Sequence, residues 1–375
     1  MSTLTLGTAT ARPGEIVTGW FDAVTLPTGG TDRLPVLIAQ GREPDGPVIW
    51  LTTGIHGGEH TGLIVIHNLL TPDLPAVLRG TVVVVLALNP AGLRTKQRLP
   101  YYLQTDPNRL FPTPIKDQKD LEGLDSEDKP RSEIEEAYQR LYDAIVASGA
   151  ACLLDLHNAW VGSIPFAFRD PVFYRKERGP GPTRAQARQL QTRVGEMLDA
   201  FGFTTVNEFV ATDYVNKNLH RSVSGSVLNG ARIPAATIEL GSWMHIDRGV
   251  VEACCAGLRN VMRWLGMLPG GMEPIEGIPV IRPGYPVRRH VHPYAPQAGI
   301  VHRLARPGET VHKGQPLARL TDIFGQPVVG QDGLLRSEHN GFVMAWHHGV
   351  VVYQGDPVMD LAIPDEGDLV VPYPD

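Results

Sequence analysis

The chain has few cysteines and no long apolar run, and both absences narrow what it can be. Only three of its 375 residues are cysteines, and two of these, Cys254 and Cys255, are sequence neighbours that would form a poor disulfide pair. We therefore expect a protein of the reducing cytoplasm. No apolar run is long enough to cross a bilayer. The N-terminal residues have neither the basic start nor the apolar core of a signal peptide.

The sequence also lacks a concentration of positive charge. Lys and Arg number 34 against 40 Asp and Glu, the net charge is −6, and the two signs are mixed along the chain. This pattern argues against nucleic acid or an anionic membrane surface as a partner. It leaves a homo-oligomer open.

Short apolar runs alternate with amphipathic stretches between about residues 35 and 265. Strands rich in Val, Ile and Leu that are separated by helices indicate an α/β fold, in which a mostly parallel mixed sheet is flanked by helices. The expected strands are Leu34–Ala39, Pro47–Thr53, Thr81–Leu88, Ala151–His157, Thr204–Val210 and Ala235–Leu240. The expected helices are Thr61–Leu70, Arg131–Ser148, Thr183–Phe201 and Arg248–Leu265.

The pattern changes at the Pro- and Gly-rich segment Leu268–Pro274. Beyond it, short β-type runs are separated by Gly turns, which predicts a smaller all-β barrel or sandwich similar to the biotinyl/lipoyl fold. We therefore divide the chain into residues 1–268 and 269–375. A carrier domain of this fold needs a lysine in an exposed hairpin, and Lys313 lies in the other turn. We expect the second domain to have a structural or site-capping role.

A candidate metal site begins in the segment Trp50–Gly62, where His56 and Glu59 lie three residues apart in a glycine-rich turn after an apolar run. Imidazole nitrogen and carboxylate oxygen are both zinc ligands, and a catalytic zinc usually has three protein ligands and one open position. His157, at the end of another apolar run, is the best third ligand. His56, His157 and Glu239 all lie at or just past predicted strand ends, where parallel sheets place their sites. Asp155 shares the strand face of His157, and we expect it to accept a hydrogen bond from that ring.

The C-terminal part of the chain is rich in histidine. These residues are spread over predicted β-hairpins without a ligand spacing, so the sequence predicts one zinc per chain and no second site. They are His290, His292, His302, His312, His339, His347 and His348.

Five motifs occur in a fixed order along the first domain: HGGEHTG, Asn89-Pro90, DPNRLFP, LLDLHN and TIELG. Together they resemble the succinylglutamate desuccinylase/aspartoacylase family, which belongs to the zinc carboxypeptidase-like group. The resemblance covers Pro47 to about Leu265, and it implies His56, Glu59 and His157 as zinc ligands. It also implies a general base at Glu239 and substrate binding by Asn108 and Arg109. The family carries an arginine that stabilises the oxyanion, and of Arg94 and Arg98 we favour Arg98.

Elementary chemistry supports two of these roles. Hydrolysis needs a carboxylate that is not a metal ligand, to take a proton from water and pass it to the leaving nitrogen. Glu239 fits because a charge inside an apolar strand end is costly without a task; the alternative is a structural carboxylate. Arg109 offers a planar fork that suits a carboxylate; the alternative is an ordinary surface arginine.

These observations predict a zinc-dependent amide hydrolase, a deacylase that acts on an N-acyl amino acid or a related small amide. A zinc carboxypeptidase acting on short peptides is one alternative. A non-catalytic binding protein that retains the metal is the other. The loops Val161–Pro182 and Asp213–Gly225 are expected to set the substrate preference.

Overall fold

The computed structural model describes residues 3–113, 131–176, 181–347 and 349–373. Within these ranges, thirteen strands form one large sheet, of which twelve follow the order β15-β18-β20-β13-β11-β9-β12-β7-β5-β6-β4-β3, and β8 pairs with β18. The pairs β5–β6, β5–β7 and β7–β12 are parallel. The sheet becomes antiparallel toward the β3 edge, through β4.

The strands of the first part of the chain have the following bounds: β1 Leu4–Leu6, β2 Ala9–Ala11, β3 Ile16–Thr25, β4 Thr31–Gln40, β5 Glu43–Thr53, β6 Arg79–Val85, β7 Cys152–Ala159, β8 Gly162–Ser163, β9 Phe166–Arg169, β10 Val172–Tyr174, β11 Thr204–Asn207 and β12 Ala235–Ser242. The central strands β6 and β7 are buried along almost their whole length. A strand that is covered on both faces needs a continuous apolar run rather than an alternating one. This is why the sequence predicts these strands well.

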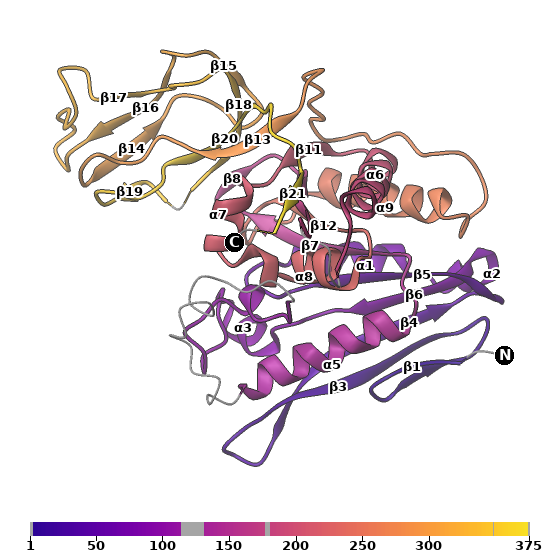
Figure 1. The fold of residues 1–375 in the computed structure, drawn as a ribbon. Coiled ribbons are helices and arrows are strands. Elements are labelled where there is room, and N and C mark those ends of the chain that lie inside the picture. The colour runs from indigo at the N-terminus through magenta and orange to yellow at the C-terminus, as the bar shows by residue number, and fades with distance from the viewer. Residues whose placement is uncertain (1–2, 114–130, 177–180, 348, 374–375) are drawn as a thin grey trace.

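Helices flank the sheet (Figure 1). Their bounds are α1 Thr61–Leu69, α2 Leu74–Val77, α3 Pro90–Thr95, α5 Glu133–Ala147, α6 Arg184–Phe201, α7 Ala211–Asn216, α8 Val223–Ser226 and α9 Arg248–Trp264, with 3₁₀ turns η1 Pro107–Arg109 and η2 Leu219–Arg221 and a π-helical turn η3 Val227–Ala231. Helices α1 and α6 both pack on α9, and α5 packs against β3. Capping boxes begin α5 at Ser132 and α6 at Thr183.

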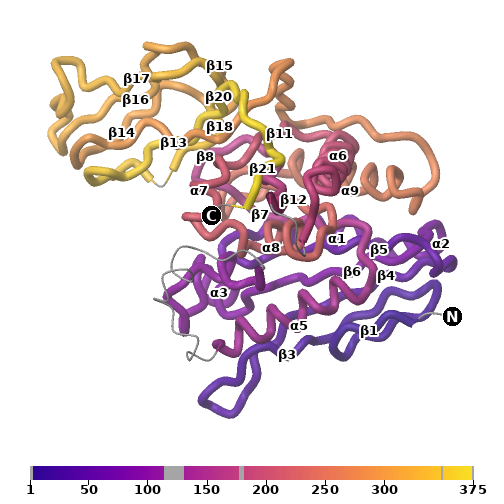
Figure 2. Tube along the Cα trace, in the orientation of Figure 1, coloured from indigo at the N-terminus to yellow at the C-terminus, as the bar shows by residue number. Residues whose placement is uncertain are grey.

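The strands after residue 286 divide between two sheets. They are β13 Val287–Val291, β14 Gly299–Arg303, β15 Thr310–Val311, β16 Pro316–Thr321, β17 Leu334–Arg336, β18 Gly341–Trp346, β19 Val351–Val352, β20 Met359–Pro364 and β21 Val370–Pro372. Strands β13, β20, β18 and β15 extend the large sheet, while β17, β16, β14 and β19 form a separate antiparallel sheet. Figure 2 shows this C-terminal β region at one end of the molecule. Strand β21 returns to pair with β10.

The predicted fold class is therefore confirmed: a large mixed sheet with a mostly parallel centre, flanked by helices, is followed by an antiparallel β region. The helix expected over Thr61–Leu70 is α1, and that expected over Arg248–Leu265 is α9. The strand expected over Thr204–Val210 ends earlier, at Asn207. The division at residue 268 stays a prediction. His348 and part of the loop Val161–Pro182 lie outside the described residues.

Candidate active site

Three neighbouring parallel strands bring the predicted site residues to one edge of the sheet. The turn that holds His56 and Glu59 follows β5 and leads into α1. His157 lies in β7, which is the neighbour of β5, and Glu239 lies in β12 directly opposite His157. The carboxyl ends of parallel strands are where open α/β sheets place their ligands.

The glycines of this turn allow a close approach of the backbone. A Cβ atom on Gly57 would lie 1.9 Å from the carbonyl carbon of Gly92, and one on Gly58 would lie 2.2 Å from Nε1 of Trp243. A side chain at Gly57 would push the turn away from the backbone of Gly92, and one at Gly58 would displace either the turn or the ring of Trp243. The two glycines thus fix where His56 and Glu59 point.

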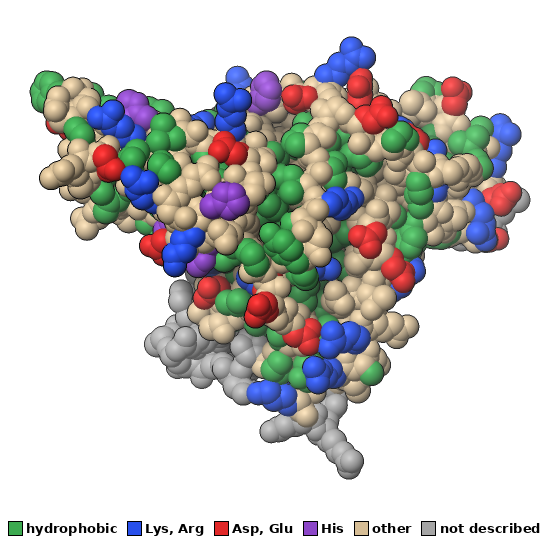
Figure 3. Space-filling view, turned by 90° about the horizontal axis from the view of Figure 1, so that it is seen from above, with side chains coloured by type: hydrophobic (Ala, Val, Ile, Leu, Met, Phe, Trp, Pro, Cys, Tyr) green, Lys and Arg blue, Asp and Glu red, His purple; other side chains and the backbone are tan. Residues whose placement is uncertain are grey.

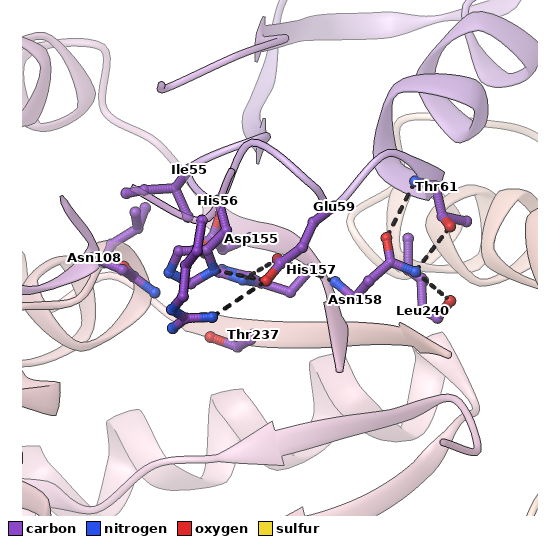
Figure 4. Close-up of polar contacts among 12 residues, drawn as sticks. Ile55, His56, Glu59, Thr61, Asn108, Asp155, His157, Asn158, Thr237 and Leu240 are labelled. Carbon is purple, nitrogen blue, oxygen red and sulfur yellow. Dashed lines mark hydrogen bonds and ion pairs between the residues drawn. The ribbon is translucent and has the colours of Figure 1, made fainter. Parts of the chain in front are cut away.

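Glu59 lies between the two histidines (Figure 4). Its Oε1 is 2.7 Å from Nδ1 of His56, and its Oε2 is 2.8 Å from Nδ1 of His157. All three side chains are buried, and their ligand atoms lie within 4.8 Å of one another. Burial alone would raise the pKa of Glu59, but the two imidazoles lower that pKa well below its usual range.

A carboxylate holds the far nitrogen of each histidine. Nε2 of His157 lies 2.7 Å from Oδ2 of Asp155, as predicted, and Nε2 of His56 lies 3.0 Å from Oδ1 of Asp106. A carboxylate partner keeps the proton on Nε2 and leaves the Nδ1 lone pair for a metal. Asp155 is fixed in turn by the hydroxyl of Thr52, which donates to its Oδ1 at 2.7 Å.

The donor set suits a divalent transition metal. Two imidazole nitrogens and one carboxylate converge, and each imidazole already has the outer hydrogen bond that metal-bound histidines usually make. Among the residues that the structure describes, this is the only group of three or more His, Cys, Asp or Glu side chains whose ligand atoms all lie within 4.8 Å of one another. The residues present therefore fit a metal ion.

Asp106 is the functional candidate that the sequence reasoning missed. Although it begins the DPNRLFP motif, the sequence assigns it no role, because His56, its partner, lies fifty residues earlier in the chain. Its Oδ2 accepts a hydrogen bond from Nη2 of Arg98 at 2.8 Å, and its Oδ1 also caps η1 by accepting from the backbone of Asn108 at 2.9 Å. Asp106 thus connects the candidate metal ligand His56 with the predicted oxyanion arginine.

Glu239 lies opposite His157 and is not among the three residues whose candidate ligand atoms converge. Its Oε2 is buried and has no hydrogen-bond partner among the described residues. Burial is the main reason that the pKa of Glu239 rises to about 7, and the nearby His157 opposes that rise. A carboxylate whose pKa is near neutrality can both take up and release a proton.

The two candidate arginines lie in different places. Arg98 lines the cavity beside Glu239, and its Nη1 is 3.6 Å from Oε1 of Glu59. Arg94 instead forms an ion pair with Asp32, with Nη2 to Oδ1 at 2.6 Å. The geometry therefore brings Arg98 to the site and leaves Arg94 outside it.

The predicted substrate-binding pair lies in the wall of the same cavity. Oδ1 of Asn108 accepts a hydrogen bond from the backbone of Val223 at 2.9 Å. Arg109 donates from Nε to the carbonyl of Lys217 at 2.8 Å and from Nη1 to the carbonyl of Asn108 at 2.7 Å. These backbone contacts hold the guanidinium in place, so it presents a fixed orientation to a ligand.

The cavity has a volume of about 530 Å³, and its far wall comes from residues with no predicted role. Arg289 of β13 and Asp360 of β20 line it together with Glu208, and Arg289 is paired with Asp360 at 3.0 Å and Glu208 at 3.3 Å. The predicted loops also contribute, through Asp170 and Tyr214. Burial, helped by the charge of Glu208, raises the pKa of Asp170 to about 7.

Fold and site together define a class: an α/β protein with a candidate metal centre at the carboxyl ends of its parallel strands. Residues 45–170 match the model of the succinylglutamate desuccinylase/aspartoacylase catalytic domain. Over residues 45–170 the chain thus matches the succinylglutamate desuccinylase/aspartoacylase family that its motifs predict, and members of this family are hydrolases that act on amides. No curated protein sequence matches the chain significantly.

Solved structures share the fold over almost the whole chain. A succinylglutamate desuccinylase/aspartoacylase from Rhodobacter sphaeroides is 20% identical, with a TM-score of 0.68, and the match covers 93% of this chain and 96% of that one. The product-bound ectoine utilization protein EutE (DoeB) from Ruegeria pomeroyi is 19% identical, with a TM-score of 0.69 and coverage of 93% and 95%. An aspartoacylase family protein from Mesorhizobium loti is 18% identical, with a TM-score of 0.68 and coverage of 97% and 96%.

The surface charge and the helices give no further indication of the family. On the face shown in Figure 3, positive and negative side chains are interspersed. Within the described residues, no helix is both long and apolar enough to span a membrane.

Proposed function

We propose that the protein is a zinc-dependent amide hydrolase that releases an acyl group from an N-acyl amino acid or a related small amide. One observation carries this proposal. His56, Glu59 and His157 converge as a ligand set, while Glu239 lies beside them as a carboxylate whose buried Oε2 has no hydrogen-bond partner among the described residues. A ligand set with a separate proton carrier is what metal-assisted amide hydrolysis requires.

We assign the roles as follows. His56, Glu59 and His157 would hold zinc, which would polarise the scissile carbonyl and make water more acidic. Glu239 takes the proton of the attacking water and delivers it to the leaving nitrogen. Arg98 lies within 3.6 Å of Glu59 and so can face the negative charge that develops on the carbonyl oxygen.

Substrate binding falls to the other side of the cavity. We assign Asn108 and Arg109 to a carboxylate of the amino acid part, because a fixed guanidinium can bind a carboxylate through two parallel hydrogen bonds. The enclosing wall supports a small substrate over a long peptide: Arg289 and Asp360 from the C-terminal β region close one side of the cavity. This favours a deacylase over a carboxypeptidase.

A substrate panel tests the proposal. N-acetyl and N-succinyl amino acids are incubated with the zinc-loaded protein, the chelated protein and the chelated protein after zinc is restored, and the released amine is measured. We expect amine release that chelation abolishes and zinc restores. Short peptides with a free C-terminus are assayed in parallel; faster cleavage of peptides would make the protein a carboxypeptidase, and no hydrolysis of either class would leave a metal-retaining binding protein.

A further inference from the structure

Three histidines meet on the C-terminal β region, and none of them lines the cavity described above. His290 lies in β13, His292 follows the end of that strand, and His339 lies in the turn between β17 and β18. Their ring centroids are 4.7 Å apart for His290 and His339, 5.6 Å for His290 and His292, and 6.4 Å for His292 and His339. No ligand spacing in the sequence indicates this cluster, because several strands separate His292 from His339 and only the fold brings the two together.

The backbone fixes these three side chains independently of the active site. His290 and His292 are two residues apart, so they share one side of the extended chain, and Arg289 points to the other side, into the cavity. The turn that carries His339 is held by Ser337, whose hydroxyl donates to the carbonyl of His339 at 2.6 Å. The cluster is therefore built from two separate, ordered segments.

Ring nitrogens are available in the cluster. Nε2 of His292 donates to the carbonyl of Arg336 at 3.3 Å, and its Nδ1 keeps its lone pair, with no partner among the described residues. For the rings of His290 and His339, the described residues likewise supply no hydrogen-bond partner. Burial, together with the neighbouring His339 and His292, lowers the pKa of His290.

We propose that His290, His292 and His339 form a second metal site, for a divalent transition ion such as Zn²⁺ or Ni²⁺. Three imidazoles that bind one zinc through Zn–N bonds of about 2.0–2.1 Å at tetrahedral angles have ring centroids about 5 Å apart. The observed separations of 4.7–6.4 Å bracket that value. The donor nitrogens do not yet converge as those of His56, Glu59 and His157 do, so binding requires rotation of the half-buried rings.

The chemistry of the cluster separates it from the first site. It offers three imidazoles, which suit zinc, nickel and copper rather than magnesium or calcium. Its rings are half-buried, whereas those of His56 and His157 are buried and tied to carboxylates. We therefore expect weaker binding and faster exchange than at the first site.

Zinc binding to the tag-free full chain tests the proposal. The protein is stripped with chelator and dialysed against graded Zn²⁺, and bound zinc per chain is counted by atomic emission. His157→Ala removes the first site, so this variant should still bind about one zinc by the logic of a three-ligand site. Adding His290→Gln and His339→Asn should remove that zinc. His312→Asn, an exposed histidine of the same region, is the matched control and should change nothing.

A second measurement does not depend on the His157 variant. In excess zinc the wild-type chain should bind about two ions and the His290→Gln/His339→Asn variant about one. Loss of a residue that only hydrogen-bonds to a metal ligand typically weakens metal binding by roughly 10–100-fold, and loss of two ligands should weaken zinc binding at the cluster by more than this. Equal zinc content in the wild-type and cluster variants would overturn the proposal. If the zinc site assigned to His56, Glu59 and His157 were wrong, the result would look different, because the His157→Ala variant would then bind as much zinc as the wild type.

Discussion

Replacement of Glu239 by glutamine is the sharpest test of the proposed chemistry. The amide keeps the size of the side chain but cannot take a proton from water. Loss of a general acid–base group typically slows a reaction by about 10²–10⁴-fold, which corresponds to about 3–5 kcal/mol of activation free energy. Because one carboxylate would serve both proton transfers, we expect a loss of kcat near the upper end of that range.

The structure also predicts what this substitution should leave unchanged. Oε2 of Glu239 accepts no hydrogen bond from the described residues, so the variant should fold normally. Its zinc content should match that of the wild type, because Glu239 is not among the three converging ligands. Turnover, zinc content and thermal unfolding are measured on the same preparation. Near-normal turnover would refute the mechanism, and loss of zinc would make Glu239 a ligand and Glu59 the candidate base.

Three further substitutions probe the surroundings. Asp106→Asn should weaken zinc binding by about 10–100-fold, because His56 loses its anionic partner; a competing chelator measures this, and unchanged affinity would contradict the role. Arg109→Lys should raise KM for carboxylate-bearing substrates, because lysine lacks the planar fork; a fully active variant would point to another anchor. In the folded protein the pKa of Asp170 is raised from 3.8 to about 7. The protonated carboxyl therefore stabilises the fold fully below pH 3.8, and this stabilisation is lost as the pH rises through 7. Asp170→Asn should therefore resist denaturant better than wild type at about pH 8 but not at about pH 4; the same difference at both values would contradict the raised pKa.

The sequence predicts those elements that carry their own local signals. Helices α5 and α6 begin at Ser132 and Thr183, each of which forms a capping box with the residue three positions later. The buried central strands are recognised by their apolar runs. Strand β3, Ile16–Thr25, is missing from the predicted strands, because it is a half-exposed edge strand whose residues alternate in burial.

Within the site, too, the residues that carry a local sequence signal are predicted and those without one are not. His56, Glu59 and His157 follow apolar runs, so the rule for parallel sheets predicts that they meet. Asp106 lies in a turn between elements, and its role depends on a contact with His56 that no local pattern encodes. Arg289 is still further away in sequence and shows no motif. Residues whose roles depend on long-range packing are therefore the ones that sequence reasoning misses.

The residues of the far wall of the cavity show why contacts between distant parts of the sequence matter for substrate preference. Arg289 and Asp360 come from the C-terminal β region, yet Arg289 is also paired with Glu208, which follows β11 of the large sheet. Leaving one member of a buried ion pair without its partner typically costs about 3–5 kcal/mol. The two parts of the chain thus share one buried charge network at the cavity, so a change in the C-terminal β region alters the electrostatics that a substrate meets.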